Sequence, residues 1–214
     1  MLDIDELIVN LDGAGEVDLS GSHVSTKGLK QLVDALKTHA TVTDVRLDEN
    51  DLKDKGVMML VMALDKNCRV TTLSLSQNKI TNDGALYLAL MLRRNKTLRT
   101  LDLRFNAISD YGAMLLADSI IENATLDRLC LTDNQITARG ADTLANLVMK
   151  RRTPLKHLDL DSNYIDAKAA ARLRSAGQKT GTEINFSCQH MGFRASEYMM
   201  WHAPETLATA IAAQ

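Results

Sequence analysis

A repeat of 28 residues fills most of this 214-residue chain and constrains its fold more than any other feature. The clearest copy runs from Thr71 to Leu98. The second leucine of each copy gives the column Leu19, Leu47, Leu75, Leu103, Leu131 and Leu160. Three residues later stand Ser22, Asn50, Asn78, Asn106, Asn134 and Asn163. A glycine column follows with Gly28, Gly56, Gly84, Gly112, Gly140 and then Ala169. Self-similarity at such a fixed period is the signature of a solenoid.

Each repeat contains one short strand and one helix. Leu73 and Leu75 alternate with serines, which predicts a short strand with one buried face. Thr81 is a suitable helix N-cap, and the apolar residues that follow have the 3.6-residue period of an amphipathic helix. Asn95 stands where many helices end in a left-handed residue. Neither element can bury its apolar face alone, so the repeats must stack on one another.

The two polar columns have structural roles in this interpretation. An asparagine amide can bond backbone groups where the chain leaves the strand. Glycine allows a helix to approach the neighbouring repeat closely, or a backbone shape that a Cβ would oppose. We therefore assign neither column to chemistry.

The pattern L-x-L-x-x-N-x-[IL]-[ST]-x-x-G-x-x-x-L resembles the ribonuclease-inhibitor-like class of leucine-rich repeats, from Glu16 to about Ser187. The resemblance implies a right-handed α/β solenoid of six 28–29-residue repeats. A curved parallel sheet of about seven strands would lie inside and six helices outside. The resemblance is specific for architecture and says little about function, because one fold serves many partners.

The two ends of the chain depart from the repeat. Residues 1–15 have helical apolar spacing and predict an N-terminal helical cap on the solenoid of residues 16–187. Residues 188–214 predict a C-terminal cap or tail with a final helix, and the whole chain is expected to fold as one unit. The tail is also a candidate partner site, because methionine and aromatic side chains suit interfaces: Tyr198, Met199, Met200 and Trp201.

Composition narrows the class of protein. The 25 basic and 27 acidic residues nearly balance, which argues against a nucleic-acid or anionic-membrane partner. No apolar run is long enough for a membrane span. Three cysteines without CxxC spacing indicate free thiols in a reducing compartment, and the acidic start does not resemble a targeting sequence. We predict a cytoplasmic protein, with a cytoskeletal or ciliary location as the alternative.

No catalytic motif is found in the sequence. The GxSxG, HExxH and GxxxxGK[ST] motifs are missing, and the five histidines are scattered. His157, Asp159 and Asp161 share one strand face, yet alternate residues do so in any sheet. We predict no catalytic residue, metal site or cofactor.

The concave face of the predicted sheet is the candidate binding surface. Solenoids bind partners there, and its charged residues are Asp18, Asp44, Arg46, Asp48, Asp102, Arg104, Arg128, His157, Asp159 and Asp161. Including Glu16 and Glu183, the face has eight acids against three arginines, which favours a protein partner with a basic patch. The convex helical face is expected to be mostly solvated charge.

Four functions fit these features. The leading one is a non-enzymatic protein–protein interaction module. The second is actin regulation, because a short run of such repeats resembles the C-terminal half of tropomodulins. The third is GTPase activation like that of the Ran-activating repeat proteins. The fourth is a structural subunit of a large assembly such as a ciliary complex. The sequence does not set the oligomeric state.

Overall fold

The computed structural model describes residues 15–38, 41–65, 69–150 and 155–186. Within these residues, strands and helices alternate along the chain. The strands are Glu16–Asp18 (β1), Asp44–Arg46 (β2), Thr72–Ser74 (β3), Thr100–Asp102 (β4), Arg128–Cys130 (β5), His157–Asp159 (β6) and Glu183–Asn185 (β7). The helices are Thr26–Thr38 (α2), Lys53–Leu64 (α3), Asn82–Arg94 (α4), Asp110–Glu122 (α5), Ala138–Val148 (α6) and Ala167–Thr180 (α7).

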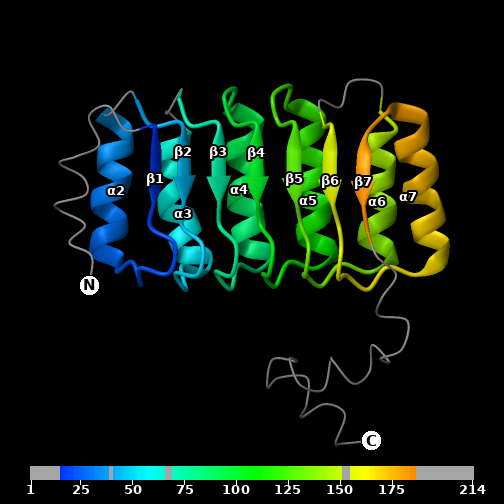
Figure 1. Cartoon of the computed structure of the whole chain (residues 1–214), viewed down its shortest axis with the longest axis horizontal. Coiled ribbons are helices and arrows are strands. Elements are labelled where there is room, and N and C mark those ends of the chain that lie inside the picture. Colours follow the sequence, from blue (N-terminus) through cyan, green and yellow to red (C-terminus); the bar gives the residue numbers. More distant parts are fainter. Residues whose placement is uncertain (1–14, 39–40, 66–68, 151–154, 187–214) are drawn as a thin grey trace, which may run out of the picture.

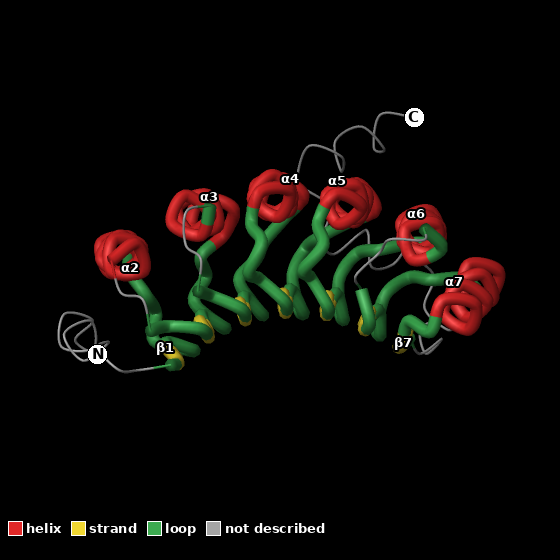
Figure 2. The backbone as a smooth tube through the Cα atoms, turned by 90° about the horizontal axis from the view of Figure 1, so that it is seen from above, coloured by secondary structure: helices red, strands yellow, loops and turns green. Residues whose placement is uncertain are grey.

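The seven strands form one parallel sheet in sequence order, β1 to β7. Neighbouring strands pair residues one repeat apart, so Leu73 pairs with Leu101 and Leu101 with Leu129. The helices lie in a row behind the sheet (Figure 1). Seen from above, the strands line the inside of an arc and the helices its outside (Figure 2). The predicted right-handed leucine-rich-repeat solenoid is confirmed.

A continuous apolar core fills the space between the sheet and the helices. The repeated leucines of strand and helix, such as Leu75, Leu88 and Leu103, have no exposed surface. Leu103 belongs to a central repeat and is covered by the repeats on both sides. Burial of these columns is what joins six short units into one core.

The asparagine column forms a ladder at the edge where the strands end. Asn78 Nδ2 donates to Leu47 O at 2.8 Å and to Ser76 O at 2.9 Å. Its Oδ1 accepts from the backbone amides of Asn50 and Leu52. Each such side chain thus satisfies backbone groups of two repeats where sheet pairing stops, as the sequence predicted.

The residues that end the helices behave differently from the prediction. Asn95 is not left-handed but extended, with φ −66° and ψ 130°. Its Nδ2 donates to Leu64 O of the preceding repeat, and its Oδ1 accepts from the amides of Thr97 and Leu98. Asn123 repeats the arrangement with Leu92 O. A second asparagine ladder therefore holds the opposite edge, and these bonds fix an extended backbone.

The predicted terminal segments lie outside the described residues. These are the N-terminal helical cap, apart from Gly15, and the tail of residues 188–214. None of the helices in the described ranges combines the length and apolar character that a membrane span requires.

Candidate functional site

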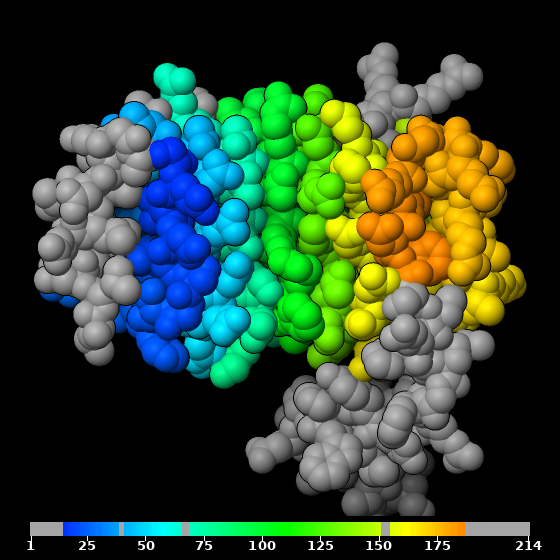
Figure 3. Space-filling view, in the orientation of Figure 1, coloured from blue at the N-terminus to red at the C-terminus, as the bar shows by residue number. Residues whose placement is uncertain are grey.

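The first and third residues of each strand, and the residue two places after it, form three rows across the concave face, the face that Figure 3 shows. In the central row, pairing places Asp18 beside Arg46, Asp102 beside Cys130, and Cys130 beside Asp159. The predicted site residues therefore share one continuous surface. Each repeat contributes one band to it. The backbone pairing of the sheet fixes the spacing between them.

Asp159 is the centre of a cluster at the C-terminal end of this face. Its carboxylate accepts from Cys130 Sγ at 3.2 Å and from Asn185 Nδ2 at 2.5 Å. Arg128 Nη1 lies 3.5 Å away. Burial, followed by the bond to Asp159, raises the pKa of the Cys130 thiol to about 12. The thiol is neutral at physiological pH and is therefore a poor nucleophile.

Asp102 and Arg104 form a tight pair in the middle of the face. Arg104 Nη2 lies 2.7 Å and Nε 2.8 Å from Asp102 Oδ2. This hydrogen bonding raises the pKa of the Arg104 guanidinium, which stays charged. Asp48 is held in a similar way, because its Oδ1 accepts from Ser74 Oγ at 2.6 Å and from the Ser76 amide at 2.7 Å.

The N-terminal end of the face is also paired. Arg46 Nε lies 2.6 Å from Glu16 Oε1. Hydrogen bonds from Ser20, together with the charge of Arg46, lower the pKa of Asp18. Asp44 accepts from Thr43 Oγ1 at 2.6 Å. Most of the predicted acids are therefore held in place by neighbouring residues of the protein itself.

Two of the remaining candidates differ in what they offer a partner. His157 Nδ1 lies 2.8 Å from Glu183 Oε2, which occupies both side chains. Asp161 is half-buried, and among the described residues no hydrogen bond or ion pair engages its carboxylate. Asp161 is thus the acid of this face that a basic group can reach with the least rearrangement.

Sequence reasoning missed Phe105. The residue is 45% exposed, and its backbone has the left-handed φ of 54° that bulky residues rarely adopt. It follows Arg104 at the rim of the concave face. The signal was present in the sequence, because the same repeat position holds Glu49, Gln77, Asp133 and Ser162. Phenylalanine and arginine are both enriched in the cores of protein–protein interfaces.

Within ranges 15–38, 41–65, 69–150 and 155–186, no three His, Cys, Asp or Glu side chains cluster to hold a metal ion. The tail candidates Tyr198, Met199, Met200 and Trp201 fall outside these ranges.

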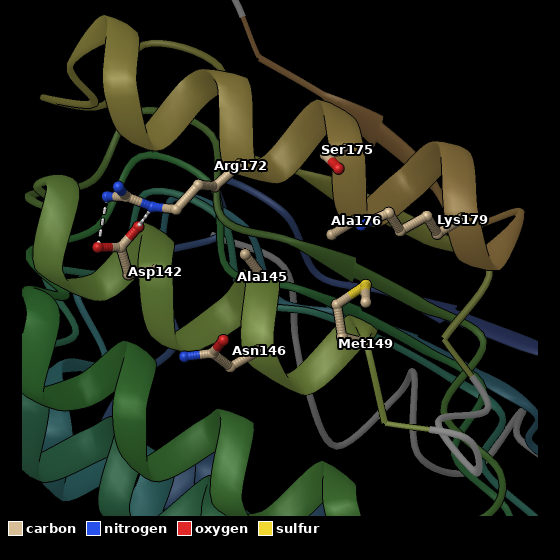
Figure 4. Close-up of a pocket in the computed structure, with 8 residues that line it drawn as sticks. All are labelled: Asp142, Ala145, Asn146, Met149, Arg172, Ser175, Ala176 and Lys179. Atoms are coloured by element: carbon tan, nitrogen blue, oxygen red, sulfur yellow. Dashed lines mark hydrogen bonds and ion pairs between the residues drawn. The ribbon is translucent and has the colours of Figure 1, made fainter.

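A groove of about 400 Å³ lies between α6 and α7 on the helical side (Figure 4). Asp142 and Arg172 close one end with a paired carboxylate and guanidinium. Ala145, Met149 and Lys179 also line it. The carboxylate among the residues that line the groove is therefore paired with an arginine.

Comparisons with known proteins agree with the geometry. A leucine-rich-repeat family model matches residues 38–61, 66–89, 94–117 and 122–145. A solved structure of leiomodin-1 actin-binding site 2 is similar, with a TM-score of 0.56 and 19% identity over 99% of this chain and 96% of that chain. So is the tropomodulin C-terminal domain of Caenorhabditis elegans, with a TM-score of 0.57 and 12% identity over 84% of this chain and 94% of that one. No curated protein sequence gives a match.

The repeats, the sheet and these matches define a class. The chain is a leucine-rich-repeat protein. At identities this low, the two solved structures show the shared fold alone.

Proposed function

We propose that this protein is a non-enzymatic interaction module that binds another protein through its concave sheet face. The observation that carries the proposal is the network of paired side chains on that face, from Glu16–Arg46 through Asp102–Arg104 to the Asp159 cluster. A preorganised surface loses little conformational entropy on binding. We assign the repeats to the ribonuclease-inhibitor-like class because of their 28–29-residue period. We also propose that the protein is cytoplasmic, because its three cysteines lack CxxC spacing and indicate free thiols in a reducing compartment.

The partner we propose carries a basic patch with an adjacent apolar group. The acid excess of the face attracts cations, and Asp161 is the acid whose carboxylate none of the described side chains engages. Phe105 offers an aromatic surface beside Arg104 for an apolar side chain. Electrostatic attraction of this kind speeds association and selects the orientation of the partner.

Parallel affinity capture tests this proposal. Wild type, Asp161→Lys and Phe105→Ala would be used as baits, with Lys168→Glu on α7 as the control. The expected result is a protein retained by wild type and the control and lost from both concave variants. A partner retained equally by all four baits would show that the concave face is not the binding surface.

Actin regulation is the second candidate, and one observation favours it. The leiomodin-1 structure, named for an actin-binding site, is covered over nearly its whole length by this chain. Co-sedimentation with actin filaments and polymerisation assays with labelled actin monomers test it. If neither measurement differs from a buffer control, this candidate is rejected.

The tail remains a competing partner site in this proposal. Trp201 is the single tryptophan of the chain, so its fluorescence reports on the tail alone. A signal that shifts when the captured partner is added would move the site from the sheet to Tyr198, Met199, Met200 and Trp201. An unchanged signal would leave the concave face as the site.

A further inference from the structure

The convex face carries an apolar patch over its central helices. Met58 and Met62 of α3 are 38% and 65% exposed, and Leu90 of α4 is 51% exposed. Leu86 of α4 and Met114 of α5 are half-buried at the same two repeat positions. These five residues form what we call the convex patch. The patch interrupts the expected charge of the convex face, although Asp83, Arg93 and Arg94 at the ends of α4 are exposed as expected.

The convex patch is bounded by charge on both sides. The two patch positions hold Lys30 and Asp34 in α2, and they hold Asp142 and Asn146 in α6. The helices succeed one another along the outside of the arc (Figure 2), so the apolar residues lie side by side in its centre. A contiguous exposed apolar area with a polar rim is typical of an interaction site.

The two flanking helices have opposite charge. α2 contains three lysines and one aspartate, and Lys37 already pairs with that aspartate, Asp34, at 2.8 Å. α5 contains three acids and no basic residue. Two of these acids, Asp118 and Glu122, are exposed. The patch therefore has a basic helix on one side and an acidic helix on the other.

We propose that the convex patch is a self-association surface, on which a second copy of this chain packs about a two-fold axis. An axis parallel to the helices and between α3 and α4 sets each α3 against α4 of the second copy. The same axis sets each basic α2 against an acidic α5. A two-fold interface must be complementary to itself, and this arrangement meets the requirement in both its apolar and its charged parts.

The charges also select this axis over the other face-to-face arrangement. An axis perpendicular to the helices would set α2 against α2 and α5 against α5, and like charges would oppose each other. With the parallel axis, Asp118 lies level with Asp34 of the second copy. Lys30 and Lys37 flank Asp34 there, so Asp118 meets a net positive region.

The curvature of the solenoid limits the strength of this dimer. Two convex faces touch only near the axis, so α3 and α4 make the apolar contact while α2 and α5 stand further apart (Figure 2). Only long side chains such as Lys30 reach across. The dimer should be weak and dependent on concentration. It would leave both concave faces open, so a partner with two sites would bind with increased avidity.

Sedimentation velocity of the full chain tests the proposal over roughly a hundredfold range of concentration, because association follows mass action. Wild type should shift from monomer to dimer. Leu90→Glu and Met62→Glu should each raise the dissociation constant by at least about tenfold, since each places a charge in the contact. Met149→Glu is the matched control. Met149 is also an exposed convex methionine, but it lies on the α6 side away from the patch, so its replacement should change nothing.

A charge swap tests the orientation. Lys30→Glu and Asp118→Lys should each weaken the dimer about threefold to tenfold, and the double variant should recover most of the loss. Thermal melts check that every variant folds. A wild type that stays monomeric throughout overturns the proposal. A dimer insensitive to Met62→Glu and Leu90→Glu also overturns it, because the contact would then lie elsewhere on the molecule.

Discussion

Asp110 Oδ1 accepts a hydrogen bond of 3.0 Å from the backbone amide of Gly140, thirty residues later in the next repeat. The same oxygen accepts from the Thr137 amide at 2.7 Å. Asp110 thus caps the start of the helix after its own, and a carboxylate at a helix N-terminus is also favoured by the helix dipole. Asp54 does the same for Thr81 and Gly84.

This kind of contact explains three members of the glycine column, Gly84, Gly112 and Gly140. A Cβ on Gly140 would stand 2.6 Å from Asp110 Oδ1 and 2.8 Å from Ile136 Cγ2. Ala169 breaks the column where the previous helix has Ala138 instead of an acid or amide. There Asp166 caps its own helix by accepting from the Ala169 amide at 2.7 Å. A side chain at this position is therefore tolerated only where no cap arrives from the previous repeat.

Gly140→Ala should destabilise the protein by about 1–3 kcal/mol, although alanine favours helices, because the new methyl group displaces the cap and leaves the backbone amides of Thr137 and residue 140 without their acceptor. Ala169→Gly is the control at the equivalent position. It should cost only about 0.5–1 kcal/mol, the usual helix penalty of glycine. Urea melts of both variants make the comparison, and equal losses would remove the steric explanation.

The cap from the previous repeat can be introduced at α7 by substitution. Ala138→Asn alone should destabilise, because the new amide meets the Cβ of Ala169. When Ala169→Gly is added, the new side chain can accept from the backbone amide of that glycine, as Asn82 Oδ1 accepts from Gly112 at 2.9 Å. A double-mutant cycle should therefore show favourable coupling of about 0.5–2 kcal/mol. Strictly additive losses would contradict the proposed link between the two columns.

The sequence predicted the architecture because leucine, asparagine and glycine recur at one spacing. Burial of the leucines, the bonds of the asparagine ladder and the close approach of helices at the glycines all follow from that spacing. The cap from Asp110 to Gly140 was not predicted, because its partners are about one repeat apart and the column holds Asp, Asn and Ala without one residue type. Strand pairing sets the candidate residues of the concave face beside one another. Their pairing, such as Asp159 with Cys130, depends on side-chain rotamers that periodicity does not set.

Asn106 tests the ladder in the centre of the solenoid. Its Nδ2 donates to Leu75 O and Leu103 O at 3.0 Å each, and its Oδ1 accepts from the Ile80 amide. Asn106→Ala should cost about 1–3 kcal/mol by leaving buried backbone groups unpaired. Leu103→Ala gives a scale for comparison, with an expected cost of about 2–5 kcal/mol from lost burial and a cavity. Thermal melts indistinguishable from wild type would remove both assigned roles.

Cys130 makes stability sensitive to alkaline pH. Its pKa is raised to about 12 in the folded protein, whereas an unfolded thiol titrates near pH 8.5. The folded state therefore holds the proton more tightly. Its contribution to stability is complete below the pKa of the unfolded thiol. This stabilisation is lost at up to about 1.4 kcal/mol per pH unit as the pH rises toward the pKa of the folded thiol.

Denaturant melts at pH 8 and about pH 10 should show this loss in wild type and a smaller loss in Cys130→Ala. Iodoacetamide labelling gives a second measurement, in a Cys68→Ser, Cys188→Ser background. Labelling of Cys130 should be far slower in the folded protein than after denaturation. Equal rates in both states would show that the thiol is not protected.

Partner binding should depend on Asp161 more cleanly than on Asp159. Asp161→Lys removes a carboxylate that no described side chain engages, so the fold should be retained. We expect the dissociation constant of the captured partner to rise about tenfold, with most of the change in the association rate. Raising the salt concentration should slow association for wild type and have a smaller effect on the variant, because salt screens the attraction.

Asp159→Lys also breaks the contacts to Cys130, Arg128 and Asn185, so it should lower the melting temperature as well as the affinity. Lys168→Glu on the opposite face is the control and should change neither. An association rate unaffected by salt and by Asp161→Lys would exclude the acidic concave face as the docking surface.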